Sequence, residues 1–215
     1  MPELAEVEFY RKQWNPGLGQ RILDVHLHAD RRIFKKTQTD LLKEKLSRTR
    51  LLQSFCSGKW MLFQFQPSAW LGIHLGMTGS LSVQPPDFKP GPHDHLVLAQ
   101  SKHSLVFSDP RLFGQIRFHP SSSPPDWWQQ LPPSLLDPKL SENDLAAFLR
   151  RRARSPLKAV LLMQERFPGI GNWMADEILW QARIRPDCPA GRITGKHLST
   201  LTTTIKHVAT GAMST

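Results

Sequence analysis

A helical pattern opens the chain. Apolar side chains recur there every three or four positions, which predicts a helix over residues 3–15 with one apolar face: Leu4, Val7, Tyr10 and Trp14. The Pro16-Gly17 pair would end this helix, because proline cannot continue it and glycine favours a turn.

The next hundred residues alternate apolar and polar positions instead. This period of two predicts strands in four short runs: 23–27, 61–65, 105–107 and 116–118. Glycines and prolines separate the runs, and no long helical pattern lies between them. Many short strands without intervening helices predict an antiparallel sandwich or barrel.

A proline-rich segment follows, PSSSPPDWWQQLPPSLLDP, and its six prolines predict a linker. We place an N-terminal domain at residues 1–119, the linker at 120–140 and a helical domain at 141–215. Four helices are expected in the last domain: one from the Ser141/Asp144 capping pair to Arg152, one from Ser155-Pro156 through Gln164, one beginning near Asn172, and one over 195–209.

Composition narrows the class of protein. The 28 Lys and Arg residues exceed the 18 Asp and Glu residues, giving a formal net charge of +10 that favours a polyanionic partner. Ribosomal, nucleic-acid-processing and acidic-membrane proteins all fit this charge. The hydrophobic content of 40% is too high for a disordered chain. No apolar run is long enough for a membrane span, and acids stand where a signal peptide needs basic residues, so a cytoplasmic or nuclear location is expected.

Cysteine usage gives no sign of a metal site. Cys56 and Cys188 alone cannot form a four-cysteine zinc site, and both are expected to be structural thiols without a disulfide. No metal and no cofactor is expected.

The segment Pro168-Gly169-Ile170-Gly171 joins two predicted helices by a tight turn. The free N–H groups of the helix that follows would suit a phosphate. Basic residues lie just upstream: Arg150, Arg151, Arg152, Arg154 and Lys158. The same pattern also fits an ordinary helical hairpin with a solvated basic face.

Two glycine-containing loops carry side chains that could enter a base stack. Met77 lies in HLGMTGSL, and Arg111 and Phe113 lie in DPRLFG. An exposed Met or Phe can wedge between bases, and Arg can bond base edges. Taken alone, a methionine such as Met77 is more often a core residue, and a turn arginine such as Arg111 is usually only a solvated charge.

Together these segments form an ordered set: PELAEVE after the first residue, GKW at 58–60, HLGMTGSL at 74–81, HDH at 93–95, DPRLFG at 109–114, and QERFPGIGNWMADEILWQARIRP at 164–186. From residue 2 to about 211, the chain resembles the formamidopyrimidine-DNA glycosylase/endonuclease VIII family of base-excision repair enzymes. The resemblance implies an α+β fold: an antiparallel β-sandwich with an N-terminal helix, linked to a helical domain with a helix-two-turn-helix motif.

The resemblance also implies a catalytic set. With Met1 removed, Pro2 is the expected nucleophile, since a terminal amine is partly neutral at physiological pH and can form a Schiff base with the sugar. Glu3 is the expected general acid/base, Lys59 a further catalytic residue, and Glu6 a supporting one. From their position alone, Glu3 and Glu6 could simply be acids at a helix start.

Seven residues are implied to contact DNA. Three fill the space left by a flipped-out nucleotide, one binds phosphate at the turn, and three are further contacts: Met77, Arg111 and Phe113; Asn172; and His93, Arg152 and Arg154. The implied partner is double-stranded DNA with a damaged base or an abasic site, bound by a monomer, with no membrane partner.

Three features depart from the family pattern. Ala5 replaces a proline of the usual PELPEVE. A chain that kept Met1 would lack the free amine on Pro2, although a Met-Pro start favours removal by aminopeptidase. The sequence ends at Thr215, and the family's C-terminal zinc finger or zinc-free β-hairpin is expected to be absent. The alternatives are an excising enzyme without lyase activity, a non-catalytic lesion-binding protein, and an RNA- or ribosome-binding protein.

Overall fold

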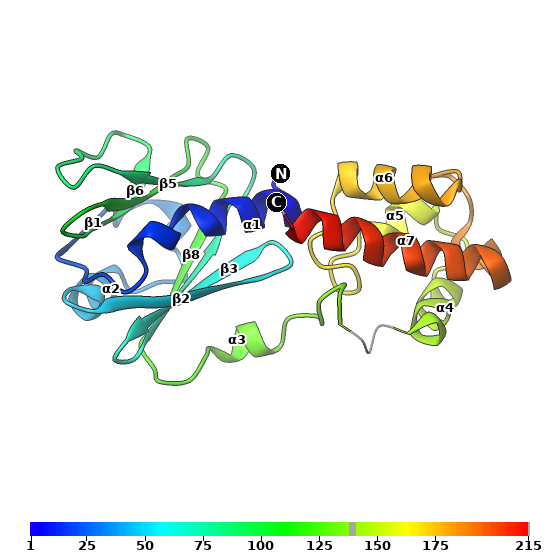
Figure 1. The fold of residues 1–215 in the computed structure, drawn as a ribbon, viewed down its shortest axis with the longest axis horizontal. Helices are drawn as coiled ribbons and strands as arrows, with labels where there is room; N and C mark the ends of the chain where they lie inside the picture. The colour runs from blue at the N-terminus through cyan, green and yellow to red at the C-terminus, as the bar shows by residue number, and fades with distance from the viewer. Residues whose placement is uncertain (138–140, 215) are drawn as a thin grey trace. The chain divides into compact units, whose positions relative to one another are not determined.

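The computed structural model describes residues 1–137 and 141–214. These residues form two compact units (Figure 1). The first comprises Met1–Pro2 and Glu6–Gln130, and the second comprises Glu3–Ala5 together with the described residues from Leu131 onward. The division falls inside the segment expected to be a linker, of which residues 138–140 lie outside the described residues.

The first unit contains two four-stranded antiparallel sheets, which confirms the predicted β-sandwich. One sheet has the order β1-β6-β7-β5, and its strands span Asp24–Leu27, Asp94–Ala99, Ser104–Ser108 and Ser80–Gln84. The other has the order β2-β3-β4-β8, with strands Arg50–Ser57, Trp60–Gln66, Ala69–His74 and Gln115–His119. Strand β3 buries Met61, Phe63 and Phe65 as predicted, but Leu62 between them is buried too, so its alternation is incomplete. Leu23 is 57% exposed and lies just before β1, so the first predicted run begins one residue too early.

The N-terminal helix α1 covers Leu4–Gln13, close to the predicted range. Trp14 follows it and is buried in the core of the first unit, with its ring centroid 4.7 Å from that of Phe63. The indole Nε1 donates to the carbonyl of Val106 at 3.3 Å, so the buried polar atom has a partner. A 3-10 turn, η1 (Asn15–Gly17), ends the segment where Pro16-Gly17 was expected to end the helix.

Strand β4 lacks the alternation from which strands are predicted, because five of its six residues are buried. The cause lies in the expected linker, where a short helix, α3 (Asp126–Gln129), packs on the sheet. A Cβ on Gly72 would come within 2.6 Å of the Trp127 ring. Trp127 therefore covers the face of β4 that would otherwise meet water. Strands β2, β5 and β6 were not predicted either, nor were α2 (Thr39–Leu46) and η2 (Arg32–Phe34).

The second unit is helical. Helix α4 (Glu142–Arg151) begins at the predicted capping pair, where the N–H of Asp144 donates to Ser141 Oγ at 3.1 Å. Helix α6 (Asn172–Ala182) begins at the predicted residue. Helix α7 (Gly195–Met213) runs past the predicted end at 209, and η3 (Ala190–Arg192) precedes it.

One predicted helix is wrong in both its start and its length. Helix α5 covers only Leu157–Leu161 and does not reach Gln164. Pro156 is extended rather than helical because it forms a β-bridge with Pro189. The Gln164 side chain instead bonds the carbonyls of Leu162 and Ile170, at 2.9 and 2.8 Å. The Pro156–Pro189 bridge joins residues distant in sequence, which local spacing does not reveal.

Candidate active site

Glu3 lies against the start of α6 in the second unit. Its buried carboxylate accepts three backbone hydrogen bonds, from the N–H groups of Gly171 (3.0 Å), Trp173 (3.0 Å) and Met174 (2.9 Å). The N–H of Leu4 also donates to the carbonyl of Gly169 at 3.0 Å. Glu3 thus satisfies N–H groups at the helix start that have no partner within the helix.

This arrangement corrects one prediction about the turn. The N–H groups expected to be free for a phosphate are occupied in part by the Glu3 carboxylate. The turn needs its glycines: Gly169 has a φ of +92°, and a Cβ on Gly171 would lie 2.3 Å from the Glu3 carboxyl carbon. Asn172, the first residue of α6, has an exposed side chain beside this contact.

The other predicted catalytic residues, Pro2, Glu6 and Lys59, lie in the first unit. Pro2 is partly buried, and Lys59 is 8% exposed in the turn between β2 and β3. Glu6 is partly buried in the first turn of α1.

His74, at the end of β4, is a candidate that the sequence analysis passed over. Its Nδ1 accepts the N–H of Gly76 at 3.0 Å, so the ring proton is on Nε2. Burial, together with the positive charges of Lys59 and Arg117, lowers the pKa of His74 to about 4. The imidazole is therefore neutral at physiological pH and presents an N–H donor close to the charge of Lys59. The position of His74 at the start of HLGMTGSL could have singled it out, but its burial could not be predicted from the sequence.

The three side chains expected to fill a flipped-out nucleotide's place are exposed on neighbouring loops of the first unit. We call Met77, Arg111 and Phe113 the wedge residues. Met77 is 47% exposed between β4 and β5, which excludes the core-methionine interpretation. Phe113 is 41% exposed between β7 and β8, in the same turn as the exposed Arg111.

A single buried carboxylate joins these two loops. Asp109 is fully buried, and its oxygens accept the hydroxyl of Thr78 at 2.7 Å and the N–H groups of Gly114 at 2.7 Å and Arg111 at 3.3 Å. The loop backbones also touch, since a Cβ on Gly76 (φ +65°) would lie 2.3 Å from the carbonyl carbon of Phe113. The structure therefore holds the wedge residues in one fixed set.

Two cations lie over the Phe113 ring. The guanidinium carbons of Arg32 and Arg111 lie 4.7 and 4.8 Å from its centroid. Such contacts keep an exposed aromatic ring oriented without burying it.

The other predicted DNA-contact residues differ in how far they are engaged within the protein. His93 is exposed, and its carbonyl accepts the N–H of Asp109 at 3.0 Å. Arg154 is exposed, whereas Arg152 stacks 3.9 Å from the Phe148 centroid and bonds Glu165 at 3.0 Å. Lys158 is paired with Asp176 at 2.8 Å. The basic stretch is therefore only partly a solvated surface.

Comparisons with known proteins agree with these motifs. Residues 1–116 match the formamidopyrimidine-DNA glycosylase N-terminal domain, and residues 133–215 match the H2TH domain of the same family. The chain belongs to the formamidopyrimidine-DNA glycosylase family. It is 34% identical to the formamidopyrimidine-DNA glycosylase of Solibacter usitatus over 99% of this chain and 77% of that protein. It is 36% identical to that of Cupriavidus pinatubonensis over 90% of this chain and 72% of that protein.

Solved structures show the same fold. A structure of MutM with DNA containing carbocyclic 8-oxo-G matches with a TM-score of 0.89 at 26% identity, covering 99% of this chain and 81% of that one. The Lactococcus lactis enzyme, non-covalently bound to DNA with an abasic site, matches with a TM-score of 0.89 at 25% identity, covering 99% and 82%. Family membership makes the protein a DNA glycosylase of base-excision repair. Within the described residues, no helix is long and apolar enough to cross a membrane.

Proposed function

We propose that this glycosylase excises a damaged base from duplex DNA and then cleaves the strand through a Schiff base on Pro2, once Met1 has been removed. The observation that carries the proposal is the fixed Glu3 carboxylate, which directly follows Pro2 in the chain and is held by three backbone N–H groups. One related structure holds DNA with carbocyclic 8-oxo-G and another holds DNA with an abasic site, which supports DNA carrying such lesions as the substrate.

The proposed chemistry uses groups of this chain only. The amine of Pro2 attacks C1′ of the damaged nucleotide, the C1′–N bond breaks, and the leaving base takes a proton from water. Glu3 accepts the proton that the amine loses and returns it to O4′ as the C1′–O4′ bond opens, which leaves an iminium between Pro2 and C1′. Water takes a proton from C2′, the C3′–O bond breaks to expel the 3′-phosphate, and hydrolysis of the iminium frees Pro2.

The fixed orientation of the Glu3 carboxylate suits it to this proton transfer. A carboxylate with three hydrogen bonds to a helix start has little freedom to rotate, so it is preorganised for proton transfer. Glu6 has a supporting role in this proposal. Lys59 and His74 are assigned to the phosphate beside the lesion, Lys59 through its charge and His74 through its Nε2–H.

The wedge residues, in this proposal, occupy the space that the flipped nucleotide leaves. Their exposure and their common attachment to Asp109 support that role. Asn172, His93 and Arg154 are assigned to backbone phosphates, with Arg152 as a further contact. The protein would act where chromosomal DNA is, in the cytoplasm of a bacterium or in a nucleus.

Borohydride trapping tests the covalent step. Protein confirmed to begin at Pro2 should form a reduced covalent complex with abasic-site duplex, and protein that retains Met1 should not. Base release without a trapped complex would favour the excising enzyme that lacks lyase activity. Lesion binding with neither release nor trapping would favour the non-catalytic alternative.

A further inference from the structure

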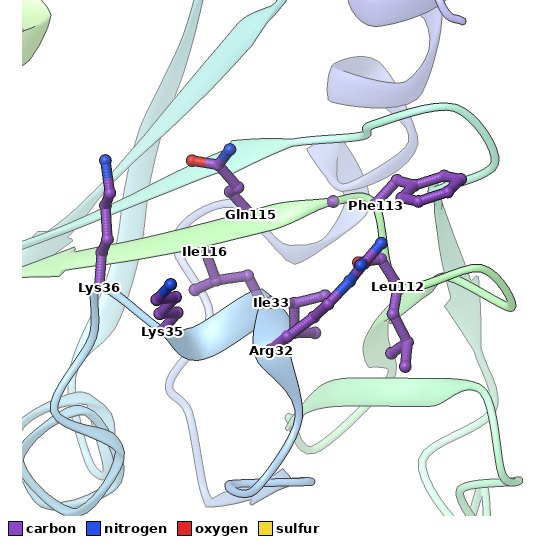
Figure 2. A pocket seen from close by; sticks show the side chains of 9 residues that line it. Arg32, Ile33, Lys35, Lys36, Leu112, Phe113, Gln115 and Ile116 are labelled. Atoms are coloured by element: carbon purple, nitrogen blue, oxygen red, sulfur yellow. The ribbon is translucent and has the colours of Figure 1, made fainter.

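A pocket of about 230 Å³ lies beside the wedge residue Phe113 in the first unit (Figure 2). Its walls are η2 with the residues that follow it, the turn before β8, and the start of β8. Three side chains from the first wall are cationic: Arg32, Lys35 and Lys36. The rest of the lining is apolar or amide and includes no acid.

These cations have no acidic partner among the described residues. Within residues 1–137 and 141–214, no carboxylate lies within 4.0 Å of Arg32, Lys35 or Lys36 in an ion pair. Three neighbouring positive charges without a counter-charge repel one another and attract an anion. The pocket has room for several water-sized groups of about 30 Å³ each, and hence for a phosphate with some of its water.

The basic segment is fixed to β8 and to the turn before it. Arg32 Nε donates to the carbonyl of Leu112 at 2.5 Å, and Arg32 Nη2 lies 3.5 Å from the carbonyl of Arg111. Thr37 Oγ1 donates to the carbonyl of Ile116 at 2.7 Å. The lysines therefore lie between two anchored residues, and their backbone is ordered before any ligand arrives.

Arg32 links the pocket to the wedge. Its guanidinium stacks on Phe113 while its side chain lines the cavity, as Figure 2 shows. Its hydrogen bonds within the described residues use Nε and Nη2, so Nη1 remains to bond an external acceptor.

We propose that this pocket binds a backbone phosphate of the duplex, with Lys35 and Lys36 supplying charge and Arg32 coupling the bound phosphate to the position of Phe113. The proposal rests on the proposed function, because it takes the duplex that the wedge residues enter as its ligand. The phosphate contact itself carries no sequence information and would hold undamaged and damaged duplexes alike.

A salt titration of DNA binding tests the site. The probe is a duplex with a tetrahydrofuran abasic analogue, and binding is measured between 50 and 200 mM salt for the wild type and the Lys35→Ala/Lys36→Ala variant. Loss of one phosphate contact should make the slope of log affinity against log salt less steep by about 0.9. Raising the salt from 50 to 200 mM would then weaken DNA binding by the variant about 3.5-fold less than DNA binding by the wild type. The control is Lys102→Ala, an exposed lysine in the β6–β7 turn, at the end of those strands away from the Asp94–Ser108 pairing.

A second variant separates the effect of the positive charge of Arg32 from the coupling of Arg32 to Phe113. Arg32→Lys keeps the positive charge but loses the planar guanidinium that stacks on Phe113 and bonds Leu112. It should keep the salt slope and reduce the fluorescence change of 2-aminopurine placed beside the lesion. Slopes for the double-lysine variant equal to those of the Lys102 control would overturn the phosphate site, and an unchanged 2-aminopurine signal would overturn the coupling. If the wild type itself binds no duplex, the proposed function fails instead.

Discussion

Gly171 lies against the carboxylate of Glu3 so closely that a Cβ at this position would come within 2.3 Å of the carboxyl carbon. The same glycine donates its N–H to Glu3 Oε2 at 3.0 Å. The turn before α6 is therefore shaped around an acid that lies 168 residues away in sequence. Any side chain at Gly171 must displace the residue that we assign to proton transfer.

Gly171→Ala should therefore reduce base excision by about 100-fold, the lower end of what a positioned acid/base contributes. Single-turnover excision from a lesion duplex measures the effect, and thermal unfolding followed by circular dichroism checks that the fold remains. Gly211→Ala in α7 is the matched control, since nothing lies within 4 Å of a Cβ there. Wild-type excision by Gly171→Ala would show that the position of Glu3 does not limit the reaction.

Thr78 and Asp109 provide a second test, of the connection between the two wedge loops. Thr78→Val removes the hydroxyl that bonds the buried carboxylate and should destabilise the protein by about 1.5–3 kcal/mol, the range for hydrogen bonds to charged groups. It should also weaken the 2-aminopurine signal of lesion opening, because Met77 is no longer tied to the Arg111–Phe113 turn. Urea denaturation gives the free energy of unfolding. Thr78→Ser keeps the hydroxyl and should restore both values, and failure of that rescue would assign the effect to packing.

Several features of the fold could be predicted from local sequence. Spacing alone predicted the cap at Ser141, the start of α6 and the burial of Met61, Phe63 and Phe65 in β3, since each depends on residues within a few positions. Glycines also predicted where the loops of Met77 and Phe113 would lie. These features are decided by backbone preference and by which face of an element is apolar.

The features that could not be predicted depend on contacts between residues distant in sequence. Glu3 looked like an ordinary acid at a helix start, and only the folded chain shows it capping a different helix. Asp109 belonged to a recognised motif, yet its bond to Thr78 joins loops 31 residues apart. Helix α5 begins after Pro156 because Pro156 pairs with Pro189. Such pairings depend on tertiary structure, which periodicity does not encode.

His74 should make stability depend on pH. Its pKa is lowered to about 4 in the folded protein, so between pH 4 and 6.5 the unfolded chain binds a proton that the folded protein does not. The free energy of unfolding should then fall as pH drops through this window, by up to about 3 kcal/mol from this residue. Burial also lowers the pKa of His26 and His95, which adds to the same trend.

Comparing the wild type with His74→Asn isolates that contribution. Asparagine cannot titrate, so urea denaturation at pH 7 and pH 4.5 should show a smaller loss of stability in the variant. Equal losses in both proteins would mean that His74 is protonated in the folded state at pH 4.5, contrary to its environment between Lys59 and Arg117.

Trp127 should stabilise the strand that follows Lys59. Its ring lies over Gly72, 4.8 Å from the ring of Trp60, and the Arg117 guanidinium carbon lies 4.7 Å from its centroid. Trp127→Ala removes a partly buried aromatic side chain and should lower the free energy of unfolding by roughly 1–3 kcal/mol, less than a fully buried tryptophan would cost.

Trp180→Ala is the matched control, because Trp180 is 80% exposed and its loss should change stability by no more than about 0.5 kcal/mol. DNA binding gives a second measurement. If Trp127 supports the turn that carries Lys59, the Trp127→Ala variant should bind an abasic-site duplex more weakly than the Trp180→Ala variant at the same salt concentration. Equal unfolding midpoints for the two variants would show that the DWW segment does not stabilise the sheet and acts only as a connection.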